Sequence, residues 1–371
     1  MTAGLPLTAM SAHSCHVEVV RHPDQLGPEV RNFMDCAERR CVEFGFPWFR
    51  NLAATVYFDS TKLRFFVLWR AGEVISVLPL RAEKTAFGWD FYALGNFYTT
   101  LFEPLFAPDC RVADLAPLLA AVKAEFPALG ALRLAPMDPA APSYALLLAA
   151  LRLSGWQPFP FFAFGNWYQR IDQSWSGYLA DRAGMLRSTI KRAGKKFAAE
   201  GGTLEIVTAP DQLDRAIAAY QHVYGASWKK PEPFPAFMPG LLRTYAAQGQ
   251  LRLGLAWLGA VPIAAQVWIV AHGKAEIYKL AYDEQYKAYA SGTLLTAKLM
   301  EQAIDADRVV EIDYLIGDDP YKQAWMRDRR ERWGVIAYHP GSLAGMAGWL
   351  QQATLRLLKQ ARGRLRRLRR A

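Results

Sequence analysis

The chain repeats itself, and this internal repeat constrains the fold more than any other feature of the sequence. Residues 17–26 read VEVVRHPDQL and residues 204–213 read LEIVTAPDQL, which places the second copy 187 residues after the first. Two further pairs follow in the same order, residues 64–73 with 252–261 and residues 132–139 with 312–320. Three ordered matches at nearly one spacing indicate a duplicated domain. We predict domains at residues 14–170 and 171–340.

Each copy contains the same succession of elements. A strand and helices come first, then a hairpin of two long strands, over residues 63–82 in one copy and 250–272 in the other. Further single strands alternate with helices after the hairpin. The turn at Ala71-Gly72 suits a hairpin because glycine tolerates positive φ. The pattern predicts an α+β fold with two mixed central sheets flanked by helices, and 371 residues is a natural length for two domains.

The net charge of +10 is concentrated at the end of the chain, because eight basic residues and no acid lie from Arg356 onward. Apolar residues recur at spacings of three and four over residues 343–368. We therefore predict a basic amphipathic tail over residues 341–371, typical of an element that docks on an anionic membrane surface. One alternative is that the tail binds tRNA or an anionic glycan. Another is that it forms a helix that packs on the body of the protein.

Composition also indicates the cellular compartment in which the protein works. Four cysteines without a CxxC pair favour a reducing environment, and six scattered histidines predict no metal site. The first twenty residues lack the pattern of a signal peptide, and no apolar run reaches the length that a membrane span needs. We expect a cytoplasmic protein, which the tail would place at the inner face of the membrane. We expect no DNA partner.

The stretch of residues 276–325 carries the clearest chemical signal. A strand that includes Tyr282 leads into a loop of small and polar residues, a helix predicted from Leu294 to Ala306, and a strand from Val309 to Ile316. Backbone N–H groups and a helix N-terminus in such a loop can hold a pyrophosphate. The predicted donor-binding residues are Tyr282, Lys287, Tyr289, Ala290, Ser291, Gly292 and Thr293.

This loop resembles the acyl-CoA-binding motif Q/R-x-x-G-x-G/A of the GNAT acetyltransferases, with Lys287, Ala290 and Gly292 at the motif positions. Alanine at the first glycine position permits close backbone approach but is not expected to adopt positive φ. From Trp167 to about Tyr338 the chain resembles the CelD/BcsL branch of GNAT-like proteins, associated with cellulose and exopolysaccharide biosynthesis. The residues that carry this signature are Asp313, Gly317, Tyr321, Lys322 and Trp325.

The tandem arrangement is similar to that of the FemAB peptidyltransferases, which use two GNAT-like domains and aminoacyl-tRNA. A basic helical face at Arg187 and Lys191 fits that similarity, and a solvated surface is the alternative for it. The resemblances imply two tandem GNAT-like domains and an enzyme that transfers an acyl group from acetyl-CoA or another acyl-CoA. The acceptor would be an amine or hydroxyl of a sugar or of a cell-envelope or exopolysaccharide precursor.

Such transfer needs a base and donors to the developing oxyanion. Backbone amides around Tyr282 are the predicted donors, and Asp313, Asp318 and Asp319 are the candidate bases. A turn and N-cap role for Asp318 and Asp319, and a salt-bridge role for Asp313, are alternatives. Beside Arg187 and Lys191, the predicted substrate-binding residues are Tyr278, Lys279, Tyr321, Lys322 and Trp325. The alternative for the aromatic residues is that their rings pack in the core. The alternative for Lys279 is a position on the protein surface.

Two other functions remain open at this stage. One is a FemAB-like aminoacyltransferase that draws on aminoacyl-tRNA and acts on a cell-wall precursor. The other is a non-catalytic GNAT-like scaffold of a polysaccharide synthesis complex. In either enzymatic case we expect the second domain to hold the donor, because the first copy lacks a loop like residues 289–293. The first domain would then shape a substrate cleft between the two.

Overall fold

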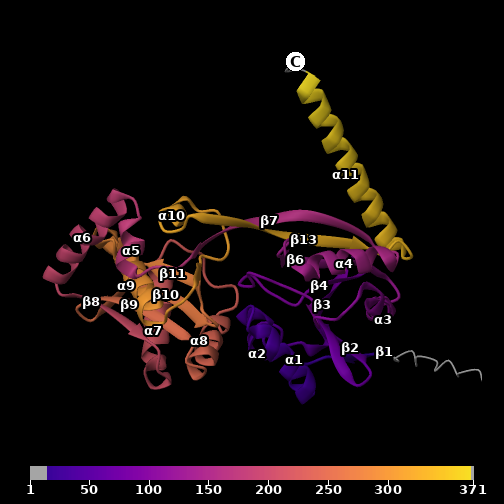
Figure 1. The fold of residues 1–371 in the computed structure, drawn as a ribbon, viewed down its shortest axis with the longest axis horizontal. Helices are drawn as coiled ribbons and strands as arrows, with labels where there is room; N and C mark the ends of the chain where they lie inside the picture. Colours follow the sequence, from indigo (N-terminus) through magenta and orange to yellow (C-terminus); the bar gives the residue numbers. More distant parts are fainter. Residues whose placement is uncertain (1–14, 369–371) are drawn as a thin grey trace, which may run out of the picture.

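The computed structural model describes residues 15–368, and side-chain positions through residue 356. Residue 14 of the predicted first domain and residues 369–371 of the predicted tail lie outside the described residues. Figure 1 shows the sheet and the helices that cover it.

The strands are β1 Cys15–Val20, β2 Leu63–Arg70, β3 Glu73–Thr85, β4 Gly88–Ala93, β5 Leu105–Phe106, β6 Leu129–Met137, β7 Gln157–Arg170, β8 Gly202–Val207, β9 Leu251–Leu258, β10 Val261–Ala271, β11 Lys274–Tyr282, β12 Glu311–Asp313 and β13 Asp328–Tyr338. The helices are α1 Pro28–Glu38, α2 Phe46–Thr55, α3 Ala116–Ala124, α4 Pro142–Leu153, α5 Trp175–Ala180, α6 Gly184–Ala199, α7 Leu213–Ala226, α8 Phe237–Ala247, α9 Ser291–Glu301, α10 Pro320–Gln323 and α11 Leu343–Leu368.

The strands form one continuous mixed sheet instead of two separate ones. Its order is β1-β2-β3-β4-β6-β13-β7-β12-β11-β10-β9-β8, with β5 paired to β3 off this path. We call residues 15–170 the first half and residues 171–340 the second half. Strand β13 of the second half lies between β6 and β7 of the first, and β7 in turn pairs with β12 of the second half. Each half therefore gives one strand to the other, and the domain limits at residue 170 stay a prediction.

The hairpins form where the sequence predicts them, and for a local reason. The residues at the β2–β3 turn, Ala71 and Gly72, both have positive φ, at 52° and 85°. Positive φ at both central residues matches the right-handed twist of the flanking strands. The matching hairpin in the second half joins β9 to β10, and its turn includes Gly259 at a φ of 58°. The repeat thus extends from sequence to structure.

Helices cover both faces of the sheet, so β2 is buried continuously from Leu63 to Leu68. Leu63, Phe65 and Val67 belong to a core cluster that also includes residues of α1, α2, α7 and α8. Phe66 and Leu68 face the opposite cluster, which includes residues of α3 and α4. A third cluster lies in the second half under α6 and α9.

The first of these clusters joins the two halves. Trp48 on α2 packs edge-on against Phe237 on α8 with ring centroids 5.5 Å apart, and Tyr98 stacks on the same Phe237 at 4.6 Å. Asn51 donates to the Phe237 carbonyl at 3.2 Å, and the Tyr245 hydroxyl donates to the Val42 carbonyl at 3.2 Å. A shared apolar core and a shared sheet hold the halves in one arrangement.

Two element boundaries in the chemical stretch differ from the prediction. Helix α9 begins at Ser291 instead of Leu294, because Ala290 adopts the left-handed conformation and lets the helix start directly after it. A π-helical turn over Gln302–Ala306 follows the helix. Strand β12 spans only Glu311–Asp313, because Leu315 and Gly317 have φ values of 54° and 103° and turn the chain out of the strand.

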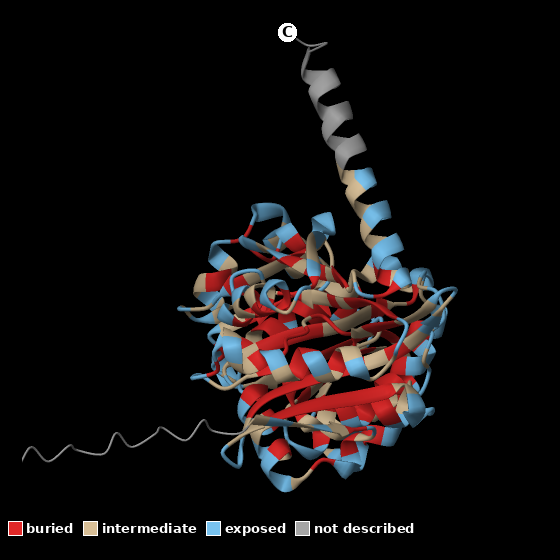
Figure 2. Cartoon of the chain, turned by 90° about the vertical axis from the view of Figure 1, so that its right-hand side faces the viewer, coloured by how far each residue is buried: buried red, intermediate tan, exposed pale blue. Residues whose placement is uncertain are grey.

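The C-terminal segment forms the predicted helix, α11, which projects from the body in Figure 1. Its first turns pack closely, since a Cβ on Gly345 would lie 2.0 Å from the His339 carbonyl oxygen. Along the described part of α11, Figure 2 shows mainly exposed and intermediate residues, with Leu343 85% exposed and Leu350 53% exposed. Over residues 15–368, no helix has both the length and the apolar character required to cross a bilayer.

Candidate active site

A cavity of about 470 Å³ opens where β11 and β12 separate. These parallel strands pair only between residues 274–276 and residues 311–313. Beyond Asp313 the chain follows β7 instead, as the Tyr314 N–H donates to the Trp167 carbonyl at 2.9 Å. We call this space the β11–β12 cavity. It is lined by Ile277, Tyr278, Lys279, Leu280, Tyr314, Leu315, Ile316, Asp319, Tyr321, Lys322 and Lys229, and from the first half by Phe97, Tyr98, Thr99, Thr100, Pro136 and Phe164.

Four of the predicted substrate-binding residues, Tyr278, Lys279, Tyr321 and Lys322, line this cavity. Trp325 does not line it, because its side chain lies in the core cluster of the second half and is 4% exposed. The Trp325 carbonyl accepts hydrogen bonds from the Tyr178 hydroxyl and from Arg182. The structure thus gathers residues of β11 and α10 at one cavity and places Trp325 behind it.

Of the candidate bases, only Asp319 lines the cavity. Asp318 forms a bidentate ion pair with Arg329 at 2.6 and 2.8 Å, on a partly exposed surface. That pairing and its hydrogen bonds lower the pKa of the Asp318 carboxyl. Asp319 lies 3.3 Å from the Lys322 ammonium and precedes α10.

Asp313 is 2% exposed and belongs to a polar network under the cavity. It accepts hydrogen bonds from Asn166 Nδ2 at 2.5 Å and from the Leu315 N–H at 2.7 Å, and it pairs with Arg330. Burial alone would raise the pKa of the Asp313 carboxyl, but Arg330 and these hydrogen bonds hold it below its ordinary value. An ionised carboxylate with this many partners orients the segment that follows β12.

Lys322 also orients the segment that follows β12, from the side opposite Asp313. Its side chain is buried, and its ammonium donates to the carbonyls of Tyr314, Ile316 and Gly317. Burial lowers the pKa of the Lys322 ammonium, and the neighbouring Asp319 offsets part of that change. Lys322 therefore holds one wall of the cavity in shape while its side chain lines it.

Two further lysines face the cavity. The Lys279 ammonium lies 3.6 Å from Glu232 and 4.2 Å from the centroid of the Tyr98 ring. Burial and the charges of Lys279 and Lys322 lower the pKa of the Lys229 ammonium to about 8. Two of the three ammonium groups around the cavity have a carboxylate partner, Lys322 with Asp319 and Lys279 with Glu232. The charge of Lys229 is therefore the one best able to attract an anionic group or a developing oxyanion. The sequence analysis did not single out Lys229 or Glu232.

A pair of buried glutamates joins the halves below the cavity. Glu43, from the first half, is 1% exposed and Glu276, on β11, is 4% exposed. The Tyr278 hydroxyl donates to Glu43 at 2.8 Å and lies 3.5 Å from Glu276. Glu43 also accepts hydrogen bonds from the N–H groups of Thr100 and Leu101. Sequence reasoning missed Glu43, because only the fold brings it to residues more than 230 positions away.

Burial and the neighbouring Glu276 raise the pKa of Glu43 from 4.5 to about 8. Burial raises the pKa of Glu276 to about 7, against the opposing charge of Lys274. A carboxyl with a pKa near the working pH can accept and release a proton readily. Because Tyr278 and Thr100 line the cavity, the Tyr278 hydroxyl connects the cavity to Glu43.

These raised pKa values predict how stability depends on pH. The folded state binds protons at Glu43 and Glu276 that the unfolded chain has already released, so their stabilising contribution is full below about pH 4.5 and is lost as pH rises to about 8. The loss amounts to ~1.4 kcal/mol per unit of pKa difference. We expect Glu43→Gln to flatten this decline, measured by urea unfolding from pH 5 to pH 8. An equal decline in both proteins would contradict the prediction.

The predicted donor loop lies at the end of β11 and leads into α9. Tyr282 is the last residue of β11, and its ring lies 4.6 Å from that of Trp228, the neighbour of Lys229. Lys287 is exposed, whereas Ser291 is 1% exposed, at the start of the helix. Gly292 lies against Tyr282, since a Cβ at Gly292 would be 3.4 Å from that ring. None of the predicted donor-binding residues lines the β11–β12 cavity itself. The contacts of Tyr282 with Gly292 and with Trp228 connect the first turn of α9 to the segment that carries Lys229.

Ala290 corrects one expectation. It adopts a φ of 49°, although alanine was expected to avoid positive φ. Its carbonyl accepts hydrogen bonds from the N–H groups of Thr293 at 2.9 Å and Leu294 at 3.1 Å, which close the first turn of α9. The N–H groups of Ser291 and Gly292 at the start of the helix have no acceptor within it, and a ligand anion can bind them.

Relieving this backbone strain should stabilise the protein. A non-glycine residue in the left-handed region costs roughly 1–2 kcal/mol, so we expect Ala290→Gly to raise the free energy of unfolding by about 1 kcal/mol. Urea unfolding at fixed pH measures this change in the free energy of unfolding. The matched control is Ala288→Gly, two residues earlier at an exposed position without positive φ. An Ala290→Gly variant no more stable than wild type would contradict this account.

Helix α6 runs beside the donor loop. The Tyr289 hydroxyl donates to Glu200, just after α6, at 2.5 Å, and the Lys196 ammonium lies 5.1 Å from the centroid of the Tyr289 ring. Arg187 and Lys191 lie on α6 and are exposed. The basic face is thus a solvent-facing surface that adjoins the loop. Among residues 15–368, no group of three or more His, Cys, Asp or Glu side chains is placed to hold a metal ion.

Parts of this chain are similar to known proteins. Residues 185–323 match the family described as acetyltransferase (GNAT) domain. The crystal structure of FemX superposes with a TM-score of 0.54 at 13% identity, covering 74% of this chain and 87% of that chain. A tandem GNAT protein from the clavulanic acid biosynthesis pathway has a TM-score of 0.46 at 14% identity, covering 86% and 98%. L-PGS from Bacillus licheniformis has a TM-score of 0.47 at 12% identity, covering 78% and 90%. A search of curated protein sequences finds no match.

The match over residues 185–323 indicates a GNAT-type fold in the second half of the chain. The predicted fold class, α+β with two tandem GNAT-like domains and flanking helices, is confirmed, except that the strands form one continuous mixed sheet instead of two.

Proposed function

We propose that this protein transfers an acyl group, with acetyl the first candidate, from acyl-CoA to an amine or hydroxyl in the β11–β12 cavity. The observation that carries the proposal is the separation of β11 from β12 beside the N-terminus of α9. An extended thioester can lie along the free edge of β11 while its pyrophosphate binds the first turn of α9. Lys287 would add a charge contact to the phosphates.

The chain's own groups supply what direct transfer needs. Beyond Glu276, no strand of the described residues pairs with the β12-facing edge of β11, so backbone N–H groups there are available to the developing oxyanion. The attacking amine or hydroxyl passes its proton to the Tyr278 oxygen as the Tyr278 proton moves to Glu43. The new bond joins the acceptor nitrogen or oxygen to the acyl carbon, and the bond from that carbon to sulfur breaks. The CoA thiolate leaves near Lys229 and Lys279.

The acceptor class in this proposal is a sugar or a precursor of the cell envelope or an exopolysaccharide. Its support is the resemblance of the segment around Asp313, Tyr321 and Lys322 to the CelD/BcsL branch. The structure gives these residues a shared place, since Asp313 and Lys322 hold the segment that forms one wall of the cavity. The domain division at residue 170, with the donor in the second domain, belongs to the same proposal.

Isothermal titration with acetyl-CoA tests the donor. We expect saturable binding that Lys287→Ala weakens and that Lys298→Ala leaves unchanged. Lys298 is a suitable control because it is an exposed lysine of α9, the helix that follows the donor loop, and it is paired with Glu301. If acetyl-CoA does not bind, the acyl-CoA proposal fails.

Aminoacyl-tRNA is the second candidate donor, and the exposed basic face of α6 beside the donor loop favours it. In that case a charged tRNA binds saturably, Arg187→Ala and Lys191→Ala weaken its binding, and the affinity falls steeply with salt. If neither acetyl-CoA nor charged tRNA binds, the non-catalytic scaffold becomes the better hypothesis.

We further propose that the C-terminal tail docks the protein on an anionic membrane surface at its cytoplasmic side. The sequence of residues 357–370 supports this proposal, with seven basic residues and no acid. Co-sedimentation with phosphatidylglycerol vesicles measures it, and glutamine at the seven basic positions should abolish the binding. Unchanged binding of that variant would overturn the docking proposal.

A further inference from the structure

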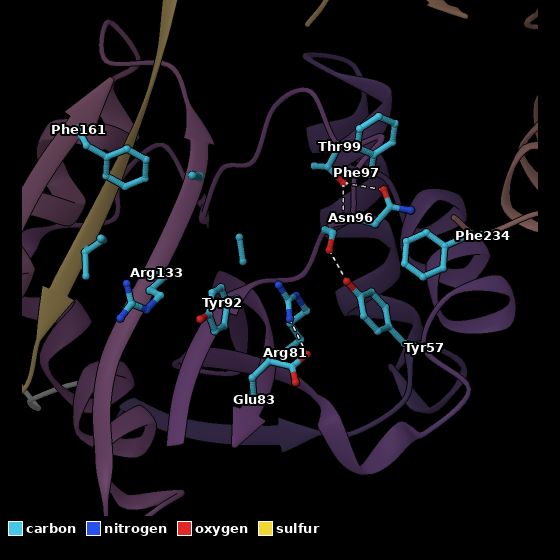
Figure 3. A pocket seen from close by; sticks show the side chains of 14 residues that line it. Tyr57, Arg81, Glu83, Tyr92, Asn96, Phe97, Thr99, Arg133, Phe161 and Phe234 are labelled. Carbon is cyan, nitrogen blue, oxygen red and sulfur yellow. Dashed lines mark hydrogen bonds and ion pairs between the residues drawn. The ribbon is translucent and has the colours of Figure 1, made fainter. Parts of the chain in front are cut away.

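The first half contains a second cavity, of about 590 Å³, which the proposed transfer reaction does not use. It lies where β4 and β6 separate, since these parallel strands pair only from Trp89 to Tyr92 along β4. It therefore occupies in the first half the place that the β11–β12 cavity occupies in the second. Figure 3 shows its side chains, and we call it the β4–β6 cavity.

Three polar side chains form a row across its floor. Arg81 on β3 lies opposite Tyr92 on β4, and Tyr92 lies opposite Arg133 on β6. Residues directly opposite one another on adjacent strands project from the same face of a sheet. The guanidinium carbons of Arg81 and Arg133 lie 4.5 and 5.8 Å from the centroid of the Tyr92 ring. In Figure 3 the Tyr92 ring lies between the two arginines.

Both guanidinium groups are held in place by carboxylates that use only part of their donors. Arg81 Nη1 donates to Glu83 at 2.6 Å, and Arg133 Nε donates to Asp90 at 2.7 Å. A guanidinium has five N–H donors, so each arginine keeps donors for a ligand. Pairing with a carboxylate fixes their direction before a ligand arrives, which reduces the entropy cost of binding.

Two buried donors at this cavity have no acceptor among the described residues, Arg81 Nε and Asn96 Nδ2. The Asn96 side-chain oxygen accepts from the Tyr98 N–H at 2.9 Å, which directs its amide nitrogen away from that contact. A buried donor without an acceptor costs about 1–3 kcal/mol. Both donors belong to residues that line the cavity, so its lining contains unpaired donors in addition to the two arginines.

The rim of the cavity is aromatic and connects it to the transfer site. Phe97 is 66% exposed and Phe161 is 37% exposed, and Phe234 of the second half also lines the cavity. Exposed aromatic rings around a few directed polar groups are typical of a small-molecule site. Phe97 and Thr99 line the β11–β12 cavity as well, so the two cavities share a wall.

We propose that the β4–β6 cavity binds a ligand that carries an oxyanion, a phosphate or a carboxylate, between Arg81 and Arg133. Resting on the proposed function, this ligand is the acceptor, anchored by its anionic group while its amine or hydroxyl extends past Phe97 into the β11–β12 cavity. The binding claim itself depends on Arg81 and Arg133 and not on the transfer reaction.

Isothermal titration of the full chain tests the claim with two probes, inorganic pyrophosphate for the phosphate arm and D-glucuronate for the carboxylate arm. D-glucose serves as the neutral control. We expect saturable binding of at least one anion, weakened roughly tenfold or more by Arg81→Met. Arg81→Met is the first variant to test, because it does not leave the Glu83 carboxylate unpaired. The Lys62 ammonium lies 3.5 Å from Glu83 and remains its partner. Arg133→Met should weaken binding similarly.

The control variant is Arg152→Met, which removes an exposed arginine of α4 that does not line the cavity. It should bind the anion as the wild type does. The proposal is overturned if neither anion binds saturably, or if Arg81→Met binds as tightly as wild type. Acetyl-CoA titrated into the same variants separates this result from the proposed function. If an anion binds but acetyl-CoA does not, the proposed anion site in the β4–β6 cavity stands and the proposed acyl-CoA donor is wrong.

Discussion

Replacing Glu43 by glutamine is expected to lower the rate of acyl transfer by roughly 10²-fold or more, the usual contribution of a general base. Glutamine keeps the size of the side chain and can still accept a hydrogen bond from Tyr278, but it cannot take up the proton. The wild-type rate should rise with pH and level off above about pH 8, where Glu43 is ionised. The variant should lack this rise, as measured by kcat/KM from pH 6 to pH 9.

Tyr278→Phe should produce a similar loss, because it removes the hydroxyl that links the cavity to Glu43. The matched control is Glu38→Gln, since Glu38 is a buried glutamate of α1 whose pKa is also raised by burial. The Tyr278 hydroxyl donates to Glu43 and not to Glu38. A Glu43→Gln enzyme with the wild-type rate and pH profile would exclude Glu43 from the proton path. The pH profile matters because a purely structural defect would lower the rate without changing its shape.

Replacing Arg330 by methionine is expected to destabilise the fold by about 3–5 kcal/mol, the cost of leaving a buried charge without its partner. Arg330 donates to Asn166 at 2.6 Å and to Glu311 at 2.9 Å, and it pairs with the buried Asp313. These groups lie where β7, β12 and β13 meet, so the loss affects the junction of the two halves. Urea unfolding at neutral pH measures the change.

The neighbouring Arg329 provides the control. It pairs with Asp318 on a partly exposed surface, and the loss of such a pair costs about 0–1 kcal/mol. Adding Asp313→Asn to Arg330→Met should recover part of the stability, because it removes the unpaired charge. An Arg330→Met variant as stable as Arg329→Met would show that the network contributes little. Full stability with loss of activity in Asp313→Asn alone would instead restore Asp313 as a candidate base.

The sequence by itself determined the features that depend on neighbouring residues. The duplication follows from three ordered sequence matches at nearly one spacing. The two hairpins with their glycine-containing turns, the basic helix and the helix after the small-residue loop follow from periodicity and turn chemistry within single segments. Local pattern points to Tyr278 and Lys279, and the resemblance to a family signature points to Tyr321 and Lys322. The structure places all four at one cavity. Local pattern misplaced the start of α9, because the left-handed φ of Ala290 is not a preference of alanine.

Only the tertiary structure decided how the two copies combine. Strands β7 and β13 exchange places because pairing between strands far apart in sequence depends on which edges the folded halves present to one another. The packing of the two halves also brings Glu43 against Tyr278, and strand pairing within the first half places Arg81, Tyr92 and Arg133 in one row. Burial, which no single segment of sequence specifies, then raises the pKa of Glu43 and makes a surface-type residue a candidate proton acceptor.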